Sequence, residues 1–406
     1  MSKSGVESRT ETWRERSDLK EDMTTLKKIA VQTLAVGALS ASAEPAATNS
    51  VFRVWAYGDA HVGTDLRKGR ESLAAAIRQS EGKGKGPGFA WDLALDVGDN
   101  SGGQKVPEDD EGRELVRQYG ALTQHAREAI YSVCGNHDRS GLAEPEAWWF
   151  RKWVDPTGEH PESSGVTAAR RPYPVEGTWE RYSFRVGNLL FLMMSDINEP
   201  SQKVGRGDLG GNPAGVVRGE TFAWWKRMVE ANPGSLIITV HHYMLKETTL
   251  ASGEWEGMAR LPGGGYKSGY HGYFPKGAPK GASYLYFVDG VPDAQAFERY
   301  LEAHPGAIAM WIGGHTHPDN PDDASGGKPL IATKWGVHFL NVAGLTEYHN
   351  NGPRVALSRL LSFEDGSDRV RVQCYLHSDA YRPAGWYGPA EQTLQLPRPF
   401  RRRDET

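Results

Sequence analysis

Five short apolar runs, each followed at once by a block of Gly, Asp, Asn or His, constrain the fold of this chain more than any other feature. The runs are rich in Val, Ile, Leu and aromatic residues and are bounded by turn residues, which is typical of buried β-strands. They occupy residues 51–57, 91–97, 129–134, 235–240 and 307–312. Apolar residues at helical spacing lie between several of them, at 67–79, 113–127, 220–231 and 292–304. Alternating strands and helices predict an α/β fold.

The blocks that follow the five runs carry side chains that bind metal ions. In chain order they are Gly58-Asp59-Ala60-His61, Gly98-Asp99-Asn100, Gly135-Asn136-His137-Asp138, His241-His242 and Gly313-Gly314-His315-Thr316-His317. In open α/β sheets, ligands bind beyond the carboxyl ends of the strands. Five strands that end in this way are therefore expected to converge on one site.

The chemistry of these blocks indicates more than one metal ion. Asp-x-His and His-x-His place two side chains on the same side of an extended backbone. Carboxylate, imidazole and amide together suit Mn, Fe or Zn better than Ca. The side chains are too many for one ion, and a shared carboxylate can bridge two. Two ions about 3.5–4 Å apart can activate water and stabilise the attacking and leaving oxygens of an in-line displacement.

The ordered set of blocks resembles the calcineurin-like metallophosphoesterase superfamily, over roughly residues 51 to 345. Five blocks in the right order make the match highly specific. The resemblance implies a four-layer αββα sandwich, in which two mixed β-sheets are flanked by helices, with a dinuclear metal centre.

The resemblance also implies which residues hold the two ions, in two groups that share one carboxylate. The groups are Asp59, His61 and His317 for one ion, Asn136, His241 and His315 for the other, and Asp99 as the bridge. In the fourth block the resemblance favours His241, and His242 stands as the alternative ligand. Asp59 as a turn residue and Asp99 as a helix cap are structural alternatives for two of these positions.

By the same resemblance, His137 is a catalytic residue rather than a ligand. It would protonate the leaving alkoxide or steady the phosphoryl group, with Asp138 orienting it. Arg139, next in the chain, either contacts the substrate phosphate or is solvated. The implied activity is hydrolysis of a phosphate mono- or diester, a small phosphorylated substrate, by water that attacks phosphorus in line. Two alternatives are a metal-binding protein without turnover and a two-metal hydrolase of a non-phosphate bond.

Charge and cysteine content add little to this hypothesis. The chain has 47 Lys and Arg residues against 51 Asp and Glu residues, which gives no electrostatic reason to expect specific nucleic-acid binding. Cys134 and Cys374 lie in apolar, strand-like runs and are expected to be buried free thiols. A single bridge between them is the alternative.

Residues 1–50 form a leader in which 23–43 has the features of a signal peptide. Lys27 and Lys28 precede an apolar stretch at 29–39, and Ala41-Ser42-Ala43 fits a cleavage site. The apolar stretch is too short for a permanent transmembrane helix. We therefore expect export to the periplasm or the extracellular space, the alternative being a disordered cytoplasmic leader.

Residues 51–399 are expected to form one domain with two additions, at 139–181 and 250–290. Loops of this length are usually functional or disordered, and their Trp, Tyr, Lys and Arg residues suit the walls of a substrate cleft. The alternative for Trp148, Trp149 and Trp153 is packing onto the sandwich. The segment 354–376 is predicted to form a hairpin that turns at 364–367 and ends the second sheet.

Overall fold

The structure, a computed structural model, describes most of the chain beyond the leader. The described residues are 50–102, 106–140, 144–196, 217–250, 252, 258–260, 266–268, 284–285, 296–324, 327–347 and 355–403. The chain divides into two compact units, residues 1–47 and residues 48–406, and all described residues belong to the second. The expected signal peptide at 23–43 lies outside the described residues.

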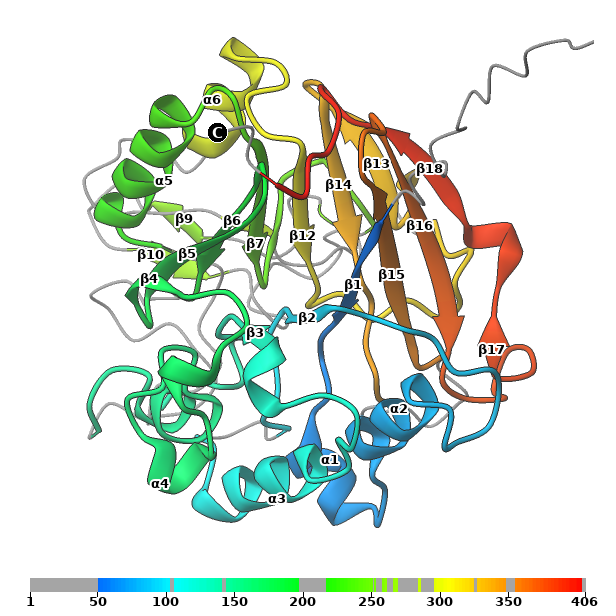
Figure 1. Ribbon diagram of the computed structural model, residues 1–406. Helices are drawn as coiled ribbons and strands as arrows, with labels where there is room; N and C mark the ends of the chain where they lie inside the picture. Colours follow the sequence, from blue (N-terminus) through cyan, green and yellow to red (C-terminus); the bar gives the residue numbers. More distant parts are fainter. Residues whose placement is uncertain are drawn as a thin grey trace, which may run out of the picture. The chain divides into compact units, whose positions relative to one another are not determined.

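The first sheet is built around β1 (Val51–Tyr57), which is the first apolar run. Two strands continue it in parallel, β2 (Leu93–Asp96) beside β1 and β3 (Ile130–Ser132) beside β2. The strands on the other side of β1 are antiparallel: β15 (Leu357–Glu364), β16 (Arg369–Leu376), and then β17 (Gly385–Trp386) and β18 (Gln392–Gln395), which both pair with β16. The sheet is therefore mixed (Figure 1).

The second sheet is also mixed and holds the fourth and fifth runs at its centre. Its strands lie in the order β13 (Ile331–Lys334), β14 (Val337–Asn341), β12 (Met310–Gly313), β7 (Leu236–His241), β6 (Leu189–Met194), β5 (Arg181–Val186) and β4 (Glu176–Thr178). The four strands from β14 to β6 are parallel, and the strands at both edges are antiparallel. Two further strand pairs are short, β8 (Met244–Leu245) with β11 (Tyr284–Leu285) and β9 (Met258–Arg260) with β10 (Tyr266–Ser268).

Side-chain alternation along β1 shows how the layers form. Phe52 and Val54 point into a core between the two sheets, where they join Phe191 of β6 and Ile238 of β7. Trp55 points the other way, into a second core. Because successive side chains of a strand face opposite sides, one apolar strand can supply both cores.

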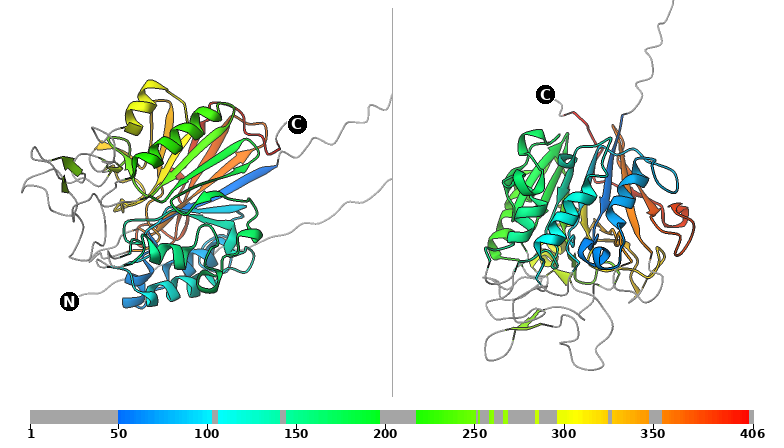
Figure 2. Two further views of the ribbon diagram at one scale, coloured as in Figure 1. Left: turned by 90° about the vertical axis from the view of Figure 1, so that its left-hand side faces the viewer. Right: turned by 90° about the horizontal axis from the view of Figure 1, so that it is seen from below.

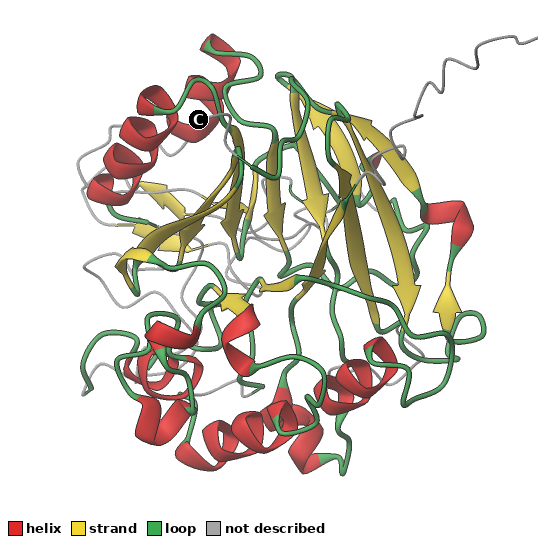
Figure 3. Ribbon diagram, in the orientation of Figure 1, coloured by secondary structure: helices red, strands yellow, loops and turns green. Residues whose placement is uncertain are grey.

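Helices cover the outer face of each sheet. The second core lies under α1 (Val62–Arg67), α2 (Ser72–Ser80) and α3 (Asp109–Tyr119). A third core places α5 (Gly219–Ala231) and α6 (Ala296–Ala303) on the second sheet, with Trp225 and Phe297 packed against Trp311. The left view of Figure 2 and the helix colours of Figure 3 show the sequence helix, sheet, sheet, helix. The predicted α/β sandwich of two mixed sheets flanked by helices is confirmed.

Two details differ from the sequence prediction. The hairpin at 357–376 forms with its turn at 364–367, but it pairs with β1 and so completes the first sheet rather than the second. The addition at 139–181, of which 139–140 and 144–181 are described, contains a π-helical turn (Phe150–Val154), α4 (Pro161–Ser164) and the edge strand β4. Most of the addition at 250–290 lies outside the described residues.

Two smaller predictions concern the cysteines and membrane insertion. Cys134 and Cys374 are both buried free thiols, as expected. Within the part of the chain that the structure describes, no helix combines the length and apolarity needed to cross a bilayer.

Candidate metal centre

The loops that follow the five predicted strands lie against one another. The loop after β1 runs beside the loop after β2, because the backbone N–H groups of Asp59 and His61 donate to the carbonyl oxygens of Gly98 and Asp99. The two sheets are joined at this end by the backbone N–H of His315, which donates to the Asp59 carboxylate over 3.1 Å. The five blocks therefore meet at one edge of the sandwich, as the sequence predicted.

One group of potential ligands comprises Asp59, His61 and His317. His317 Nε2 lies 3.0 Å from Asp59 Oδ1 and 3.1 Å from His61 Nε2, and His61 Nε2 lies 3.8 Å from Asp59 Oδ1. Two ligand atoms about 2.1 Å from one ion lie roughly 3.0–3.5 Å apart at the angles of tetrahedral or octahedral sites. Two of the three separations fall in this range and the third is somewhat longer, so the three side chains lie close enough together to share one ion.

A second group comprises Asp99, Asn136, His242 and His315. Asn136 Oδ1 lies 3.0 Å from His242 Nε2 and 2.9 Å from His315 Nδ1, and the two imidazole nitrogens are 3.3 Å apart. Asp99 Oδ2 lies 3.2 Å from His242 Nε2. The same oxygen lies 3.9 Å from His61 Nε2 in the first group, which puts Asp99 between the two groups, where a bridging carboxylate would lie.

The structure brings together six of the seven predicted ligands and places the seventh, His241, apart from them. The His241 Nδ1 accepts the backbone N–H of Tyr243, and its Nε2 has no hydrogen-bond partner among the described residues. His241 is the last residue of β7 and its ring packs toward Trp311, whereas His242 lies beyond the strand end and faces Asn136 and Asp99. His242, the second histidine of the pair, is therefore the potential ligand.

His61 of the first block and His242 of the fourth block each hydrogen-bond to a backbone carbonyl group through Nδ1. His61 Nδ1–H donates to Ser101 O over 2.9 Å, and His242 Nδ1–H donates to Val97 O over 2.9 Å. In a neutral imidazole with its proton on Nδ1, the lone pair is on Nε2, and both Nε2 atoms face the cluster. Such outer hydrogen bonds are the usual way in which proteins orient imidazole ligands.

The electrostatics of the cluster favour bound cations. Burial lowers the pKa of His61 and of His315 well below the usual value, so these imidazoles are neutral, as metal ligands must be. Burial alone would raise the pKa of Asp99, but His242, His137 and His61 around it hold the pKa well below its usual range. Despite burial, the Asp99 carboxylate raises the pKa of His242 to about 9. Asp99 thus favours a positive charge next to it. The proton on His242 supplies that charge, and a metal ion would supply it in the proton's place.

The backbone at the cluster is strained in the way that functional sites often are. Asp59, His61, Asp99 and His315 all have positive φ angles, between 43° and 67°. Residues other than Gly rarely adopt this region, at a cost of about 1–3 kcal/mol each. The backbone of Gly135 also lies very close to the Asp99 side chain. A Cβ at this position would be only 2.1 Å from Asp99 Oδ1. The fold therefore gives up stability to gather these side chains.

His137 lies at the cluster, and Asp138 supports the loops beneath it. His137 Nε2 is 3.9 Å from Asp99 Oδ2, and its backbone N–H donates to Asp99 Oδ1 over 2.8 Å. The resemblance implies that Asp138 orients His137, but the hydrogen bonds of this carboxylate go to backbone groups. It accepts the backbone N–H groups of Asp99, Ser101 and Gly135 over 2.8–2.9 Å, and so it holds the bridging loop in place.

The donor atoms present fit two divalent ions. The first group offers one carboxylate and two imidazoles, the second offers one amide oxygen and two imidazoles, and Asp99 is shared. This mixture of oxygen and nitrogen suits Mn, Fe or Zn. All but His315 and His317 are fully buried, and these two are partly exposed, which leaves one open side.

Arg139 is not free to contact a phosphate group. Its guanidinium lies 3.2 Å from Glu146 Oε1, and Arg218 binds the same carboxylate. Arg218 also contacts Glu180 at 2.8 Å. The pair of arginines and the pair of glutamates thus form a structural network beside the site.

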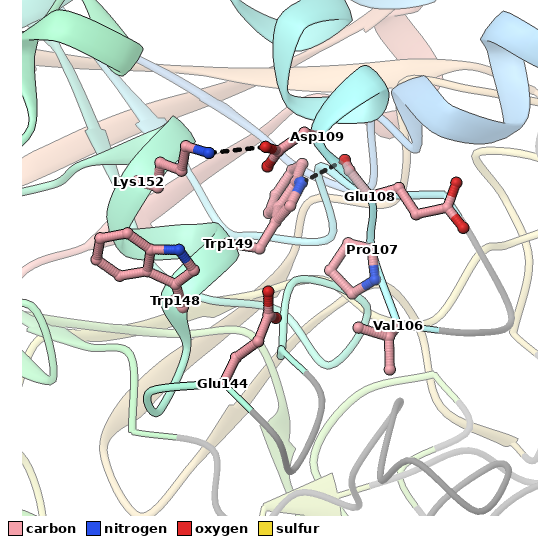
Figure 4. Close-up of a pocket in the computed structure, with 8 residues that line it drawn as sticks. All are labelled: Val106, Pro107, Glu108, Asp109, Glu144, Trp148, Trp149 and Lys152. Atoms are coloured by element: carbon pink, nitrogen blue, oxygen red, sulfur yellow. Dashed lines mark hydrogen bonds and ion pairs between the residues drawn. The ribbon is translucent and has the colours of Figure 1, made fainter.

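A cavity of about 390 Å³ lies between the segments that continue from the Asp99 loop and the His137 loop. Trp149 forms its back, donating through its backbone N–H to Ser140 Oγ and through its ring to Glu108 O. Figure 4 shows the Glu144 carboxylate directed between Trp148 and the facing wall, and Lys152 paired with Asp109. Three tryptophans of the addition at 139–181 were expected either to line a cleft or to pack onto the sandwich. Trp148 lines the cavity, Trp153 packs into the core, and Trp149 lines the cavity and packs into the core.

Comparison with known proteins yields similarity of structure only. Neither the protein-family models nor the curated proteins match this sequence. Among solved structures, the chain is similar to GAP50, the anchor in the inner membrane complex of Plasmodium, with 9% identity, a TM-score of 0.41, and 86% of this chain and 90% of that chain covered.

Two further solved structures illustrate the same level of similarity. Vacuolar Protein Sorting 29 from Cryptosporidium parvum is 13% identical with a TM-score of 0.29, over 85% of this chain and 98% of that chain. The sulfate thiohydrolase SoxB of Thermus thermophilus is 11% identical with a TM-score of 0.34, over 85% of this chain and 56% of that chain.

Proposed function

We propose that this chain is a dinuclear metal-dependent hydrolase of phosphate mono- or diesters, of the calcineurin-like metallophosphoesterase type. The observation that carries the proposal is the pair of ligand groups joined through Asp99 Oδ2, which lies 3.2 Å from His242 Nε2 and 3.9 Å from His61 Nε2. When two divalent ions are bound, they supply the Lewis acid that activates water and neutralises the phosphoryl oxygens.

The chain's own residues would do three things in this reaction. Asp59, His61 and His317 on one side, and Asn136, His242 and His315 on the other, would hold the two ions, with Asp99 fixing their separation. His137 lies close enough to this centre to donate a proton to the departing alkoxide, which general acids of suitable position accelerate by about 10²–10⁴-fold. Asp138 would keep the bridging loop in register.

We further propose that the cavity in front of Trp148, whose walls follow the Asp99 loop and the His137 loop in the chain, receives the alcohol part of the ester. Three acidic residues, Glu108, Asp109 and Glu144, are among its lining residues, against one amine, Lys152. This excess of negative charge disfavours a second phosphate group and favours a neutral or cationic alcohol. An aromatic or amine-bearing alcohol would pack on the Trp148 ring.

The proposal is tested by hydrolysis of an aryl phosphodiester and the matching monoester with residues 44–406. The protein is first treated with a chelator, and Mn, Zn or Fe is then restored. The proposal predicts turnover that returns with metal and is lost in Asp99→Ala. Two bound ions without turnover of either ester would favour a non-catalytic metal protein or a hydrolase of another bond, and would refute the phosphoesterase.

The proposed location is outside the cytoplasm. Its support is the basic, apolar and small-residue pattern at 23–43. N-terminal sequencing of the protein from the periplasm or the medium should find a chain that begins at Glu44. An intact leader on cytoplasmic protein would contradict export.

A further inference from the structure

A second buried carboxylate, on α3, contacts the loop that carries Asp99. Glu111 is 3% exposed and lies in the first turn of this helix. Its Oε2 accepts the Ser101 hydroxyl over 2.5 Å and the backbone N–H of Gly102 over 3.2 Å. A carboxylate that accepts two hydrogen bonds from a turn fixes that turn in one position, since hydrogen bonds to charged groups are stronger than those between neutral groups.

The turn that Glu111 holds is the one that orients His61. The carbonyl oxygen of Ser101 accepts the Nδ1–H of His61, and this bond directs His61 Nε2 at Asp59 and His317. Glu111 therefore acts on His61 through Ser101, without contacting any of the potential ligands itself.

Two features show that the surrounding residues are built to admit this carboxylate. Arg67 of α1 donates to Glu111 Oε1 over 3.1 Å and to the Gly102 carbonyl oxygen over 2.8 Å, so it neutralises the buried charge and closes the turn. Gly63 leaves the space that the carboxylate occupies, because a Cβ there would lie 2.1 Å from the Glu111 carboxyl carbon. The sequence near Glu111 contains no motif that indicates such a role.

We propose that Glu111 is a positioning residue that sets the metal affinity of the Asp59, His61 and His317 group by holding the Ser101–Gly102 turn. The inference rests on the proposed metal centre and not on the proposed reaction. Outer hydrogen bonds of imidazole ligands typically change metal affinity by about 10–100-fold. Removing the negative charge of Glu111 should therefore lower the affinity for one of the two ions by about that factor.

The test is equilibrium binding of Mn²⁺ or Zn²⁺ to the chelator-treated full chain, measured without substrate. Glu111→Gln should bind one ion about 10–100-fold more weakly and the other as the wild type does. Glu114→Gln is the matched control, because Glu114 is buried on the same helix but, among the described residues, pairs with Arg117 and Gln118 and not with the Ser101–Gly102 turn. It should leave both affinities unchanged.

The outcomes separate a positioning role from a structural one. Wild-type affinity for both ions in Glu111→Gln overturns the proposal, even if the melting temperature falls. If Glu111→Gln does not fold, Ser101→Ala removes only the hydroxyl that Glu111 accepts, and unchanged affinity there also overturns it. Asp59→Asn removes a ligand of the Asp59, His61 and His317 group and should abolish binding of that ion. Adding Glu111→Gln to this variant should then leave the affinity for the other ion unchanged. A wild-type chain that binds no ion would instead refute the metal centre.

Discussion

At the scale of single residues, His241 and His242 are neighbours in the chain with opposite environments. Burial lowers the pKa of His241 to about 3, and its ring accepts a backbone N–H inside the second sheet. His242 faces the Asp99 carboxylate, which raises the pKa of His242 to about 9. One histidine is a neutral core residue, and the other is placed to bind a cation.

A matched pair of asparagine variants tests this difference. His242→Asn keeps a donor for the Val97 carbonyl oxygen but removes the nitrogen that faces the cluster, so it should bind one ion at least about tenfold more weakly. His241→Asn keeps an acceptor for the Tyr243 N–H and should retain both ions. Metal content after dialysis, measured by mass spectrometry, checks both. Loss of an ion in His241→Asn alone would restore the assignment that the sequence favoured.

The potential ligands at the strand ends could be predicted from the sequence, because strand, turn and ligand follow one another directly in each block. The sequence alone could not decide between His241 and His242, because one residue of extra strand length decides which ring points into the sheet. Glu111 was missed for another reason. Its partner Ser101 lies ten positions earlier, and only the docking of α3 brings the two together.

At the scale of elements, the segment that carries Trp148 and Trp149 has two roles. Trp149 is 2% exposed and belongs to the core under the first sheet, whereas Trp148 lines the cavity. The two side chains are adjacent in the chain, and so they allow a direct comparison of packing with substrate contact.

Substituting each tryptophan with alanine should have a different effect. Trp148→Ala should leave the free energy of unfolding nearly unchanged and lower kcat/KM for aryl phosphate esters by roughly 2- to 10-fold, the magnitude of one aromatic contact. Trp149→Ala should cost about 3–5 kcal/mol of stability, as other buried aromatic truncations do. Denaturant unfolding and aryl ester kinetics measure the two effects. An unchanged kcat/KM in Trp148→Ala would remove the cavity from the substrate site.

The sheets themselves were predictable in part. The two sheets and their helices follow from apolar alternation, and β1 shows why, since its alternating residues enter two separate cores. The partner of the hairpin β15–β16 was not predictable, because Leu361 and Phe363 would suit either sheet and only tertiary pairing with β1 decides.

At the scale of the whole unit, the two ligand groups draw on both sheets. The loops after β1, β2 and β3 supply Asp59, His61, Asp99 and Asn136, and the loops after β7 and β12 supply the remaining histidines. An ion that binds only the folded chain stabilises it by about 2.7 kcal/mol when its concentration is 100 times the dissociation constant.

Metal removal should therefore lower the melting temperature by several degrees. The wild type with and without a chelator is compared by calorimetry, and His242→Asn serves as the control. The rise on adding metal should be smaller in that variant, because it lacks one ligand. Equal melting temperatures with and without metal would contradict a site that joins the two sheets.

A buried histidine away from the metal centre should make stability depend on pH. His377 Nδ1–H donates to Gln79 and its Nε2 accepts the Ser358 hydroxyl, so the ring is neutral. Burial lowers its pKa to about 3 from an ordinary value of 6.5. The unfolded chain therefore takes up this proton first, and the stability is fully present above pH 6.5 and lost as the pH falls toward 3.

Comparison with His377→Gln isolates this effect. The difference in unfolding free energy between wild type and variant should be constant above pH 6.5 and should shrink by up to about 1.4 kcal/mol per pH unit below it. Urea titrations between pH 4.5 and 8 measure the difference, and the metal ligands contribute equally to both proteins. A difference that is independent of pH would show that His377 is not buried in its neutral form.

The most direct test of the central claim is a metal titration of the chelated chain, with hydrolysis of an aryl phosphodiester followed at each addition. The two ligand groups joined by Asp99 predict that turnover rises until two ions are bound per chain and then stays constant, and that Asp99→Ala shows no such rise. A plateau at one ion, or turnover that does not depend on metal, would contradict the dinuclear phosphoesterase.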